Sequence, residues 1–141
     1  MAEINYDFGL DPIPKGRPRM NRRGRTYTPE KTRKYEQNIT LMAEMQTNSP
    51  PLKGPLVVDL LFRITRPKSS KRMFPNVRPD IDNLAKAVLD AIEGIAFNND
   101  GQIIELNMKK LYVVGPGGTT VHIREVTDDL QQDNRSIQGD S

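Results

Sequence analysis

The segment from residue 79 to residue 100 constrains the fold most, because it predicts a helix and marks both of its ends. Asp80 precedes the helix as an N-cap candidate, and Gly94 follows it as a stop signal. Between them, apolar side chains recur at the spacing of a single helical face, at Ile81, Leu84, Ala85, Val88 and Ile92. The sequence therefore predicts an amphipathic helix whose apolar stripe packs against the core.

The other elements complete an α+β fold, a small mixed four-stranded sheet with two main helices in the order β-α-β-α-β-β. Alternating or continuous apolar runs predict four strands, at residues 3–10, 55–65, 103–114 and 119–126. Thr28-Pro29-Glu30 predicts the start of the first helix, and residues 47–51 predict its end. The glycine-rich residues 115–118 predict a hairpin between the last two strands.

Composition narrows the class of protein further. With 141 residues and 35% hydrophobic residues, the chain can build one domain, predicted at 1–126 and followed by a polar, disordered tail at 127–141. The absence of Cys excludes disulfides and thiolate chemistry, and a lone histidine, His122, cannot build a His-rich metal site. Because no apolar run approaches the ~20 residues of a membrane span, we expect a cytoplasmic protein.

Positive charge is segregated along the chain. Residues 1–79 hold 16 Lys and Arg against 7 Asp and Glu, a net charge of +9, whereas residues 80–141 hold 5 against 11, a net charge of −6. Most cations lie in two stretches, nine between residues 15 and 34 and six between residues 63 and 78. Such clustering favours binding of a polyanion, because each neutralised phosphate releases counterions. The alternative is that each stretch only solubilises the chain.

An acidic cluster lies within this basic protein. Asp80 and Asp82 stand one residue apart at the predicted helix start, Lys86 follows one turn later, and Asp100 lies in a turn beyond the helix. Carboxylate oxygens are the ligands that Mg²⁺ prefers, and a hard cation beside a basic surface indicates phosphate chemistry on nucleic acid. Taken singly, each acid also has a structural interpretation, as an N-cap, a partner of the helix dipole or a turn residue.

The sequence also resembles a known family. Residues 78–92 read Arg-Pro-Asp-Ile-Asp-Asn-Leu-Ala-Lys-Ala-Val-Leu-Asp-Ala-Ile, and residues 99–103 read Asn-Asp-Gly-Gln-Ile. This pattern closely resembles the signature of RusA-type Holliday junction resolvases. Lys-Gly-Arg-Pro-Arg at 15–19, followed by Arg-Thr-Tyr-Thr-Pro at 25–29 and Tyr-Glu at 35–36, is similar to that family's N-terminal basic block. With the agreeing order of elements, the resemblance covers residues 3 to about 126.

The resemblance implies a homodimeric, Mg²⁺-dependent crossover junction endodeoxyribonuclease, with Mn²⁺ as the alternative ion. Such an enzyme resolves four-way (Holliday) DNA junctions by paired symmetric nicks, in DNA recombination and repair. Matched to the motif, Asp80, Asp82 and Asp100 are the metal-binding acids, and Lys86 joins them as a catalytic residue. Some relatives carry two successive acids where this chain has Asn99-Asp100, so a neutral amide takes the first acid's place. Asp90 stays outside the metal set as a structural residue.

Basic residues of the two stretches are expected to bind the phosphate backbones of the junction arms. The predicted DNA-binding residues are Lys15, Arg17, Arg19, Arg22, Arg23, Arg25, Arg66, Lys68, Lys71 and Arg72. For the aromatic residues Tyr27 and Phe74, stacking at an opened crossover is the alternative to a core or surface role. Two other functions stay open, a catalytically inactive architectural junction-binding protein and a nuclease acting on flaps or forks. A bacterial chromosome, a prophage or a virus could encode such a chain.

Overall fold

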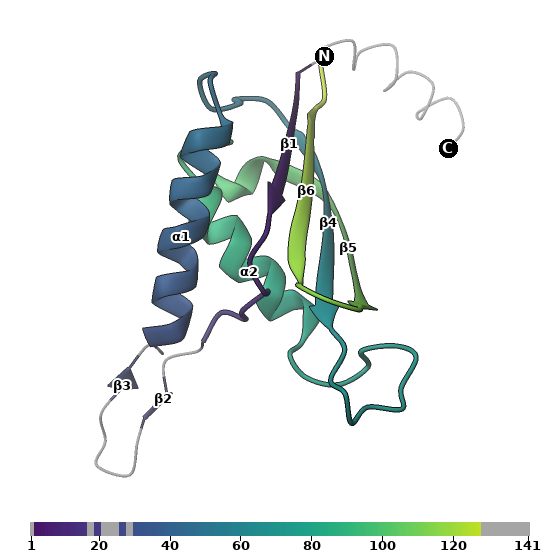
Figure 1. Cartoon of the computed structure of the whole chain (residues 1–141). Coiled ribbons are helices and arrows are strands. Elements are labelled where there is room, and N and C mark those ends of the chain that lie inside the picture. Colours follow the sequence, from purple (N-terminus) through teal and green to yellow (C-terminus); the bar gives the residue numbers. More distant parts are fainter. Residues whose placement is uncertain (1, 17–18, 21–25, 28–29, 128–141) are drawn as a thin grey trace, which may run out of the picture.

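Two helices cover one face of a single mixed sheet (Figure 1). The computed structural model describes residues 2–16, 19–20, 26–27 and 30–127. The strand order across the sheet is β1 (Glu3–Phe8), β6 (Gly118–Glu125), β4 (Leu56–Thr65) and β5 (Ile103–Val113). The helices are α1 (Glu30–Gln46) and α2 (Ile81–Ile92). Within this sheet, β4 and β5 are parallel, and β6 is antiparallel to both β1 and β4. The predicted α+β class and order of elements are confirmed.

The basic segment before α1 contains a short strand pair in addition to the predicted elements. In it, β2 (Arg19–Met20) pairs with β3 (Thr26–Tyr27) in an antiparallel arrangement. Of residues 17–25 in this basic segment, only 19–20 are described. The predicted cap at Thr28 also lies outside the described residues, and so does most of the predicted tail, 128–141.

The core lies between the two helices and the sheet. Strand β4 turns Val58, Leu60 and Phe62 toward the helices, and all three are buried, as the alternation predicted. The predicted stripe of α2 is buried from Leu84 to Ile92, while Ile81 is half-buried at its open end. Helix α1, beside α2 on the same face of the sheet, adds Tyr35, Ile39 and Ala43 to this core. These residues fix the rotation of α2, so its polar face is turned outward.

The predicted hairpin between the last two strands is wrong. Strands β5 and β6 pair with opposite edges of β4 and therefore do not touch each other. The link at residues 114–117 crosses the end of β4 and spans two strand spacings, roughly 9.6 Å. A Cβ atom at Gly117 would lie 2.5 Å from the Arg63 carbonyl oxygen, and one at Gly118 would lie 2.9 Å from the Phe8 carbonyl oxygen. The glycines therefore serve this close crossing rather than a two-strand turn.

Helix α2 is the crossover between the parallel strands β4 and β5. It begins near the C-terminal ends of these strands, where Lys110 of β5 donates hydrogen bonds to the carbonyls of Val77 and Pro79. It ends near their N-terminal ends, and a single 3₁₀ turn, η1 (Asp100–Gln102), then leads directly into β5. Within the described ranges, no helix is long and apolar enough to cross a membrane.

Candidate functional site

Asp80 and Asp82 lie together at the start of α2. Asp80 occupies the N-cap position with extended backbone angles, φ −69° and ψ 141°, yet its side chain makes no capping hydrogen bond. Asp82 accepts only a hydrogen bond from the adjacent Asn83 N–H, at 2.9 Å from Oδ1 among the contacts described. Both side chains are exposed. Capping therefore does not account for the Asp80 carboxylate, and both acids face solvent where a ligand could reach them.

Asp100 lies at the opposite end of α2. Its backbone N–H donates to Oε2 of Glu93 at 2.8 Å, and Glu93 is the C-cap residue of the helix. A 12-residue helix is roughly 18 Å long, so Asp80 and Asp100 are separated by about that length. Across the described residues of one chain, no set of three Asp, Glu, His or Cys side chains comes together that could hold a metal ion. The three aspartates thus do not converge within a single chain.

The turn that carries Asp100 is held by the side chain of Gln102. Its Nε2 donates to the carbonyls of Leu52 and Gly54, at 2.9 and 3.0 Å. Its Oε1 accepts the backbone N–H groups of Asn98 and Asn99, at 2.9 and 2.7 Å. Asn99 in turn caps η1, because its Oδ1 accepts the Gly101 N–H at 2.7 Å. The neutral amide at position 99, where some relatives have an acid, therefore has a structural role here.

Replacing Gln102 with Glu tests this arrangement, because the change preserves size but removes both N–H donors. We expect Gln102→Glu to lower the free energy of unfolding by about 1–3 kcal/mol, since the carbonyls of Leu52 and Gly54 lose their partner and face a negative charge. Urea unfolding measures the loss. The exposed Gln37 of α1 provides the control, and Gln37→Glu should cost less than about 0.5 kcal/mol. Equal stability of the two variants would contradict the role of Gln102.

Lys86 projects from the exposed face of α2, one turn after Asp82. Its Nζ lies 3.8 Å from Oδ2 of Asp90, a loose i,i+4 ion pair, and its side chain is 61% exposed. Such an exposed pair contributes little to stability, so Lys86 can reorient toward a bound phosphate at small cost. Asp90 itself also accepts a second cation, Lys15. This supports its interpretation as a structural residue outside the metal set.

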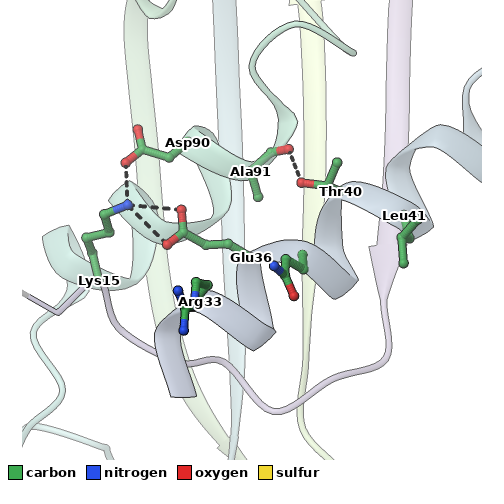
Figure 2. A pocket seen from close by; sticks show the side chains of 8 residues that line it. Lys15, Arg33, Glu36, Thr40, Leu41, Asp90 and Ala91 are labelled. Carbon is green, nitrogen blue, oxygen red and sulfur yellow. Dashed lines mark hydrogen bonds and ion pairs between the residues drawn. The ribbon is translucent and has the colours of Figure 1, made fainter. Parts of the chain in front are cut away.

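Lys15 was predicted to bind DNA, but its ammonium group is held by two carboxylates (Figure 2). Its Nζ lies 3.0 Å from both oxygens of Glu36 on α1 and 3.2 Å from Oδ2 of Asp90 on α2. Burial alone would lower the pKa of Lys15, but hydrogen bonds and charges from Glu36 and Asp90 outweigh it and raise the pKa. These side chains line an open groove of about 700 Å³ between the two helices.

The second basic stretch forms the connection between β4 and α2. Four of its cations were predicted to bind DNA, and all four have exposed side chains: Arg66, Lys68, Lys71 and Arg72. Met73 and Phe74 are also exposed, by 79% and 69%. Because this connection ends at Asp80, its cations lie on the chain segment that leads directly into the acidic pair. This exposed basic segment therefore directly precedes the candidate metal ligands in the chain.

Some predicted residues cannot be placed, and others were missed. Outside the described residues lie Arg17, Arg22, Arg23 and Arg25, while Arg19 and Tyr27 are described only as members of β2 and β3. Sequence reasoning missed Lys110, whose Nζ donates to the Pro79 carbonyl at 2.7 Å, one residue before Asp80. It also missed Glu93 and Gln102, which hold the Asp100 turn. A signal for Gln102 was its place three residues after Asn99, as in a capping box.

The chemistry of the donor set fits a hard divalent cation such as Mg²⁺ or Mn²⁺ better than zinc. Asp80 and Asp82 supply carboxylate oxygens only, without the His and Cys ligands typical of zinc. Mg²⁺ keeps several waters and is commonly held by one or two carboxylates together with substrate phosphates. The exposed pair of acids at the start of α2 meets this requirement, and a third acid would strengthen binding of the ion.

Comparison with known proteins identifies the family of the chain. A family model described as "Endodeoxyribonuclease RusA" matches residues 10–124, which include both acidic positions, Lys86 and both basic stretches. The chain is also 30% identical over 139 residues to "Uncharacterized protein YqaN" of Bacillus subtilis (strain 168), an alignment that covers 88% of this chain and 97% of that protein. Because the model spans most of the chain, including the basic connection and the acidic helix start, the protein belongs to the RusA endodeoxyribonuclease family.

Proposed function

We propose that this protein is a Mg²⁺-dependent endonuclease that resolves four-way DNA junctions by paired symmetric nicks and works as a homodimer. The observation that carries the proposal is the start of α2, where two exposed carboxylates, without a capping role for Asp80, follow directly on an exposed basic connection. Family membership supports DNA as the substrate and phosphodiester hydrolysis as the reaction. Segregated positive charge supports recognition through phosphates, hence by branch shape more than by base sequence.

The positions of the acids favour a site shared between two chains. Asp80 and Asp82 lie at one end of the α2–β5 unit, and Asp100 lies at the other. Strand β5 runs between the same two ends. Its Lys110 contacts the Pro79 carbonyl beside the start of α2, and its first residue, Ile103, follows the turn that carries Asp100. A two-fold axis through the middle of this unit would exchange its ends. Asp100 of one chain would then lie beside Asp80 and Asp82 of the other.

Strand β5 provides a suitable surface for that second copy. It pairs with β4 alone, so its outer edge is not paired to another strand in the described parts of the chain. Two large apolar side chains of this strand are exposed, Ile104 by 65% and Met108 by 36%. Exposed apolar residues on an edge strand create a liability that a partner relieves by covering them. A C₂ dimer also matches the approximate two-fold symmetry of a junction and presents two equivalent sites to opposed strands.

Each residue of the site then has a definite task. Asp80 and Asp82 would hold the metal ion from one chain, and Asp100 would complete the set from the other. When bound, the ion supplies Lewis-acid polarisation of the phosphodiester and a water with a lowered pKa. Lys86, one turn from Asp82, can stabilise the negative charge that develops on the phosphate oxygens during attack. The exposed cations from Arg66 to Arg72 hold the flanking backbone so that the scissile phosphate stays at the acids.

Cleavage of synthetic substrates tests the proposal. In Mg²⁺ we expect symmetric paired nicks in a four-way junction, little cutting of linear duplex, and ligatable ends with 5′-phosphate and 3′-hydroxyl groups. EDTA should abolish nicking, and Mn²⁺ should restore it. Binding should weaken steeply as salt rises, because phosphate contacts release counterions. Equal cutting of flaps and forks would indicate a broader branched-DNA nuclease. Tight junction binding without any cutting would indicate an architectural protein.

A further inference from the structure

Lys15 contacts both helices through two different parts of the residue. Its backbone N–H donates to the carbonyl of Asn83 in the first turn of α2, at 2.8 Å. Its Nζ reaches Glu36 on α1 and Asp90 two turns further along α2. Figure 2 shows the ammonium group between the two carboxylates, at the end of a side chain that lies along α2. Lys15 therefore contacts α2 near both of its ends and also contacts α1.

The charges around Lys15 leave no surplus for a phosphate. Lys15, Lys86 and Arg33, which lines the same groove, supply three positive charges. Glu36, Asp90 and Glu30, the partner of Arg33, supply three negative ones, so the group is neutral as a whole. The side chains of Lys15, Glu36 and Asp90 are only 27%, 19% and 30% exposed, which strengthens their pairing relative to a fully solvated ion pair. A phosphate would have to compete with two partners already within hydrogen-bonding distance. Direct DNA binding by this ammonium group is thus disfavoured.

Lys15 lies between the folded part of the chain and the N-terminal basic segment, so its contacts connect that segment to α2. It directly precedes the basic segment that continues through Arg17 and β2, and Asn83 directly follows Asp82. A second bond fixes the same point, because Thr32 Oγ1 of α1 donates to the Pro14 carbonyl at 3.0 Å. The basic segment therefore leaves the folded body at a point tied to the helix turn that carries the acids.

We infer that Lys15 is a positioning residue, which anchors the N-terminal basic segment to the metal-binding end of α2 and does not itself bind phosphate. The inference rests on the proposed function. The anchor fixes where the chain enters the N-terminal basic segment relative to the carboxylates that act on the scissile phosphate. A displacement of about 1 Å between such groups can cost about a hundredfold in rate.

Two variants separate anchoring from phosphate binding. Lys15→Met removes the charge but keeps much of the side-chain length, and Glu36→Gln leaves Lys15 intact while weakening its partner. We expect each to lower the single-turnover nicking rate at saturating enzyme by about tenfold or more. The slope of log binding constant against log salt should stay unchanged in both. Lys15→Arg, which can still pair with both acids, should recover most of the rate. Arg124→Met, on the interior strand β6, controls for the loss of one positive charge.

Amide hydrogen exchange at residue 15 gives a readout that does not depend on nuclease activity. We expect this amide, bonded to Asn83, to be protected in the wild type and to exchange faster in Lys15→Met and Glu36→Gln. If Lys15→Met instead lowered the salt slope by about 1, and Glu36→Gln tightened binding at an unchanged rate, Lys15 would be a phosphate ligand and the inference would be wrong. If the wild type nicked no junction, the proposed function would fail, while exchange at residue 15 would still decide whether the anchor exists.

Discussion

Asp82→Asn should abolish junction nicking and leave junction binding intact or slightly tighter. The change removes one carboxylate charge from the start of α2, where Asp82 is exposed and makes only a local hydrogen bond to Asn83 among the contacts described. Its loss should weaken metal binding and lower the nicking rate by about a thousandfold or more, which corresponds to about 4 kcal/mol of transition-state stabilisation. Binding should persist because a negative charge near the DNA phosphates is lost. Single-turnover cleavage and gel-shift titration in the same Mg²⁺ buffer measure both effects.

Glu44→Gln is the matched control, because it neutralises an exposed acid on α1 away from the start of α2. It should cut junctions at the wild-type rate. Thermal unfolding of both variants should show little change, since neither side chain is buried. Wild-type cutting by Asp82→Asn would remove this residue from the site and leave only its interaction with the helix dipole as an explanation. Loss of binding together with cutting would indicate a DNA-contacting role in place of a metal-binding one.

The sequence predicted the fold well where the signals are local. The stripe of α2 fixed its length and its buried face, and the proline-rich residues after position 46 marked the end of α1. The last two strands show the limit of such signals. Their link looks like a hairpin turn, but β4 inserts between them, and β4 is about 50 residues earlier in the chain. Strand neighbours are decided by tertiary packing, which a turn motif does not encode.

The candidate site was predictable in its parts but not in its assembly. The acids at the helix start follow from the motif, and Asp80 and Asp82 occupy the N-cap and the first turn of α2. The sequence predicted the helix between these acids and Asp100, but it did not show that the chain beyond the helix leaves Asp100 at the far end of α2. The role of Lys15 was hidden for a similar reason. Its partners, Glu36 and Asp90, lie 21 and 75 residues away, so a basic motif gave no sign that this cation is already paired.

Mixed dimers provide the most decisive test of a site shared between chains. Asp82→Asn and Asp100→Asn should each be inactive alone, and co-refolding the two variants should restore nicking. In a mixed dimer, one site combines both substitutions and is inactive, whereas the other combines the intact Asp82 of one chain with the intact Asp100 of its partner. Random association should therefore give roughly a quarter of the wild-type nicking rate. A plasmid with an extruded cruciform should be nicked but not linearised, because the mixed dimer has one working site.

The converse mixture excludes the alternative in which each chain builds its own site. Co-refolding the wild type with an excess of the Asp82→Asn/Asp100→Asn double variant places each wild-type acid opposite a substituted partner. Shared sites predict loss of nearly all nicking, because both sites of the mixed dimer then lack one acid. If each chain builds its own site, the mixture of wild type and double variant should retain activity. The mixture of the two single variants should then show no recovery. That result would require Asp100 to act away from the ion, and it would leave the exposed residues Ile104 and Met108 of β5 without the partner proposed to cover them.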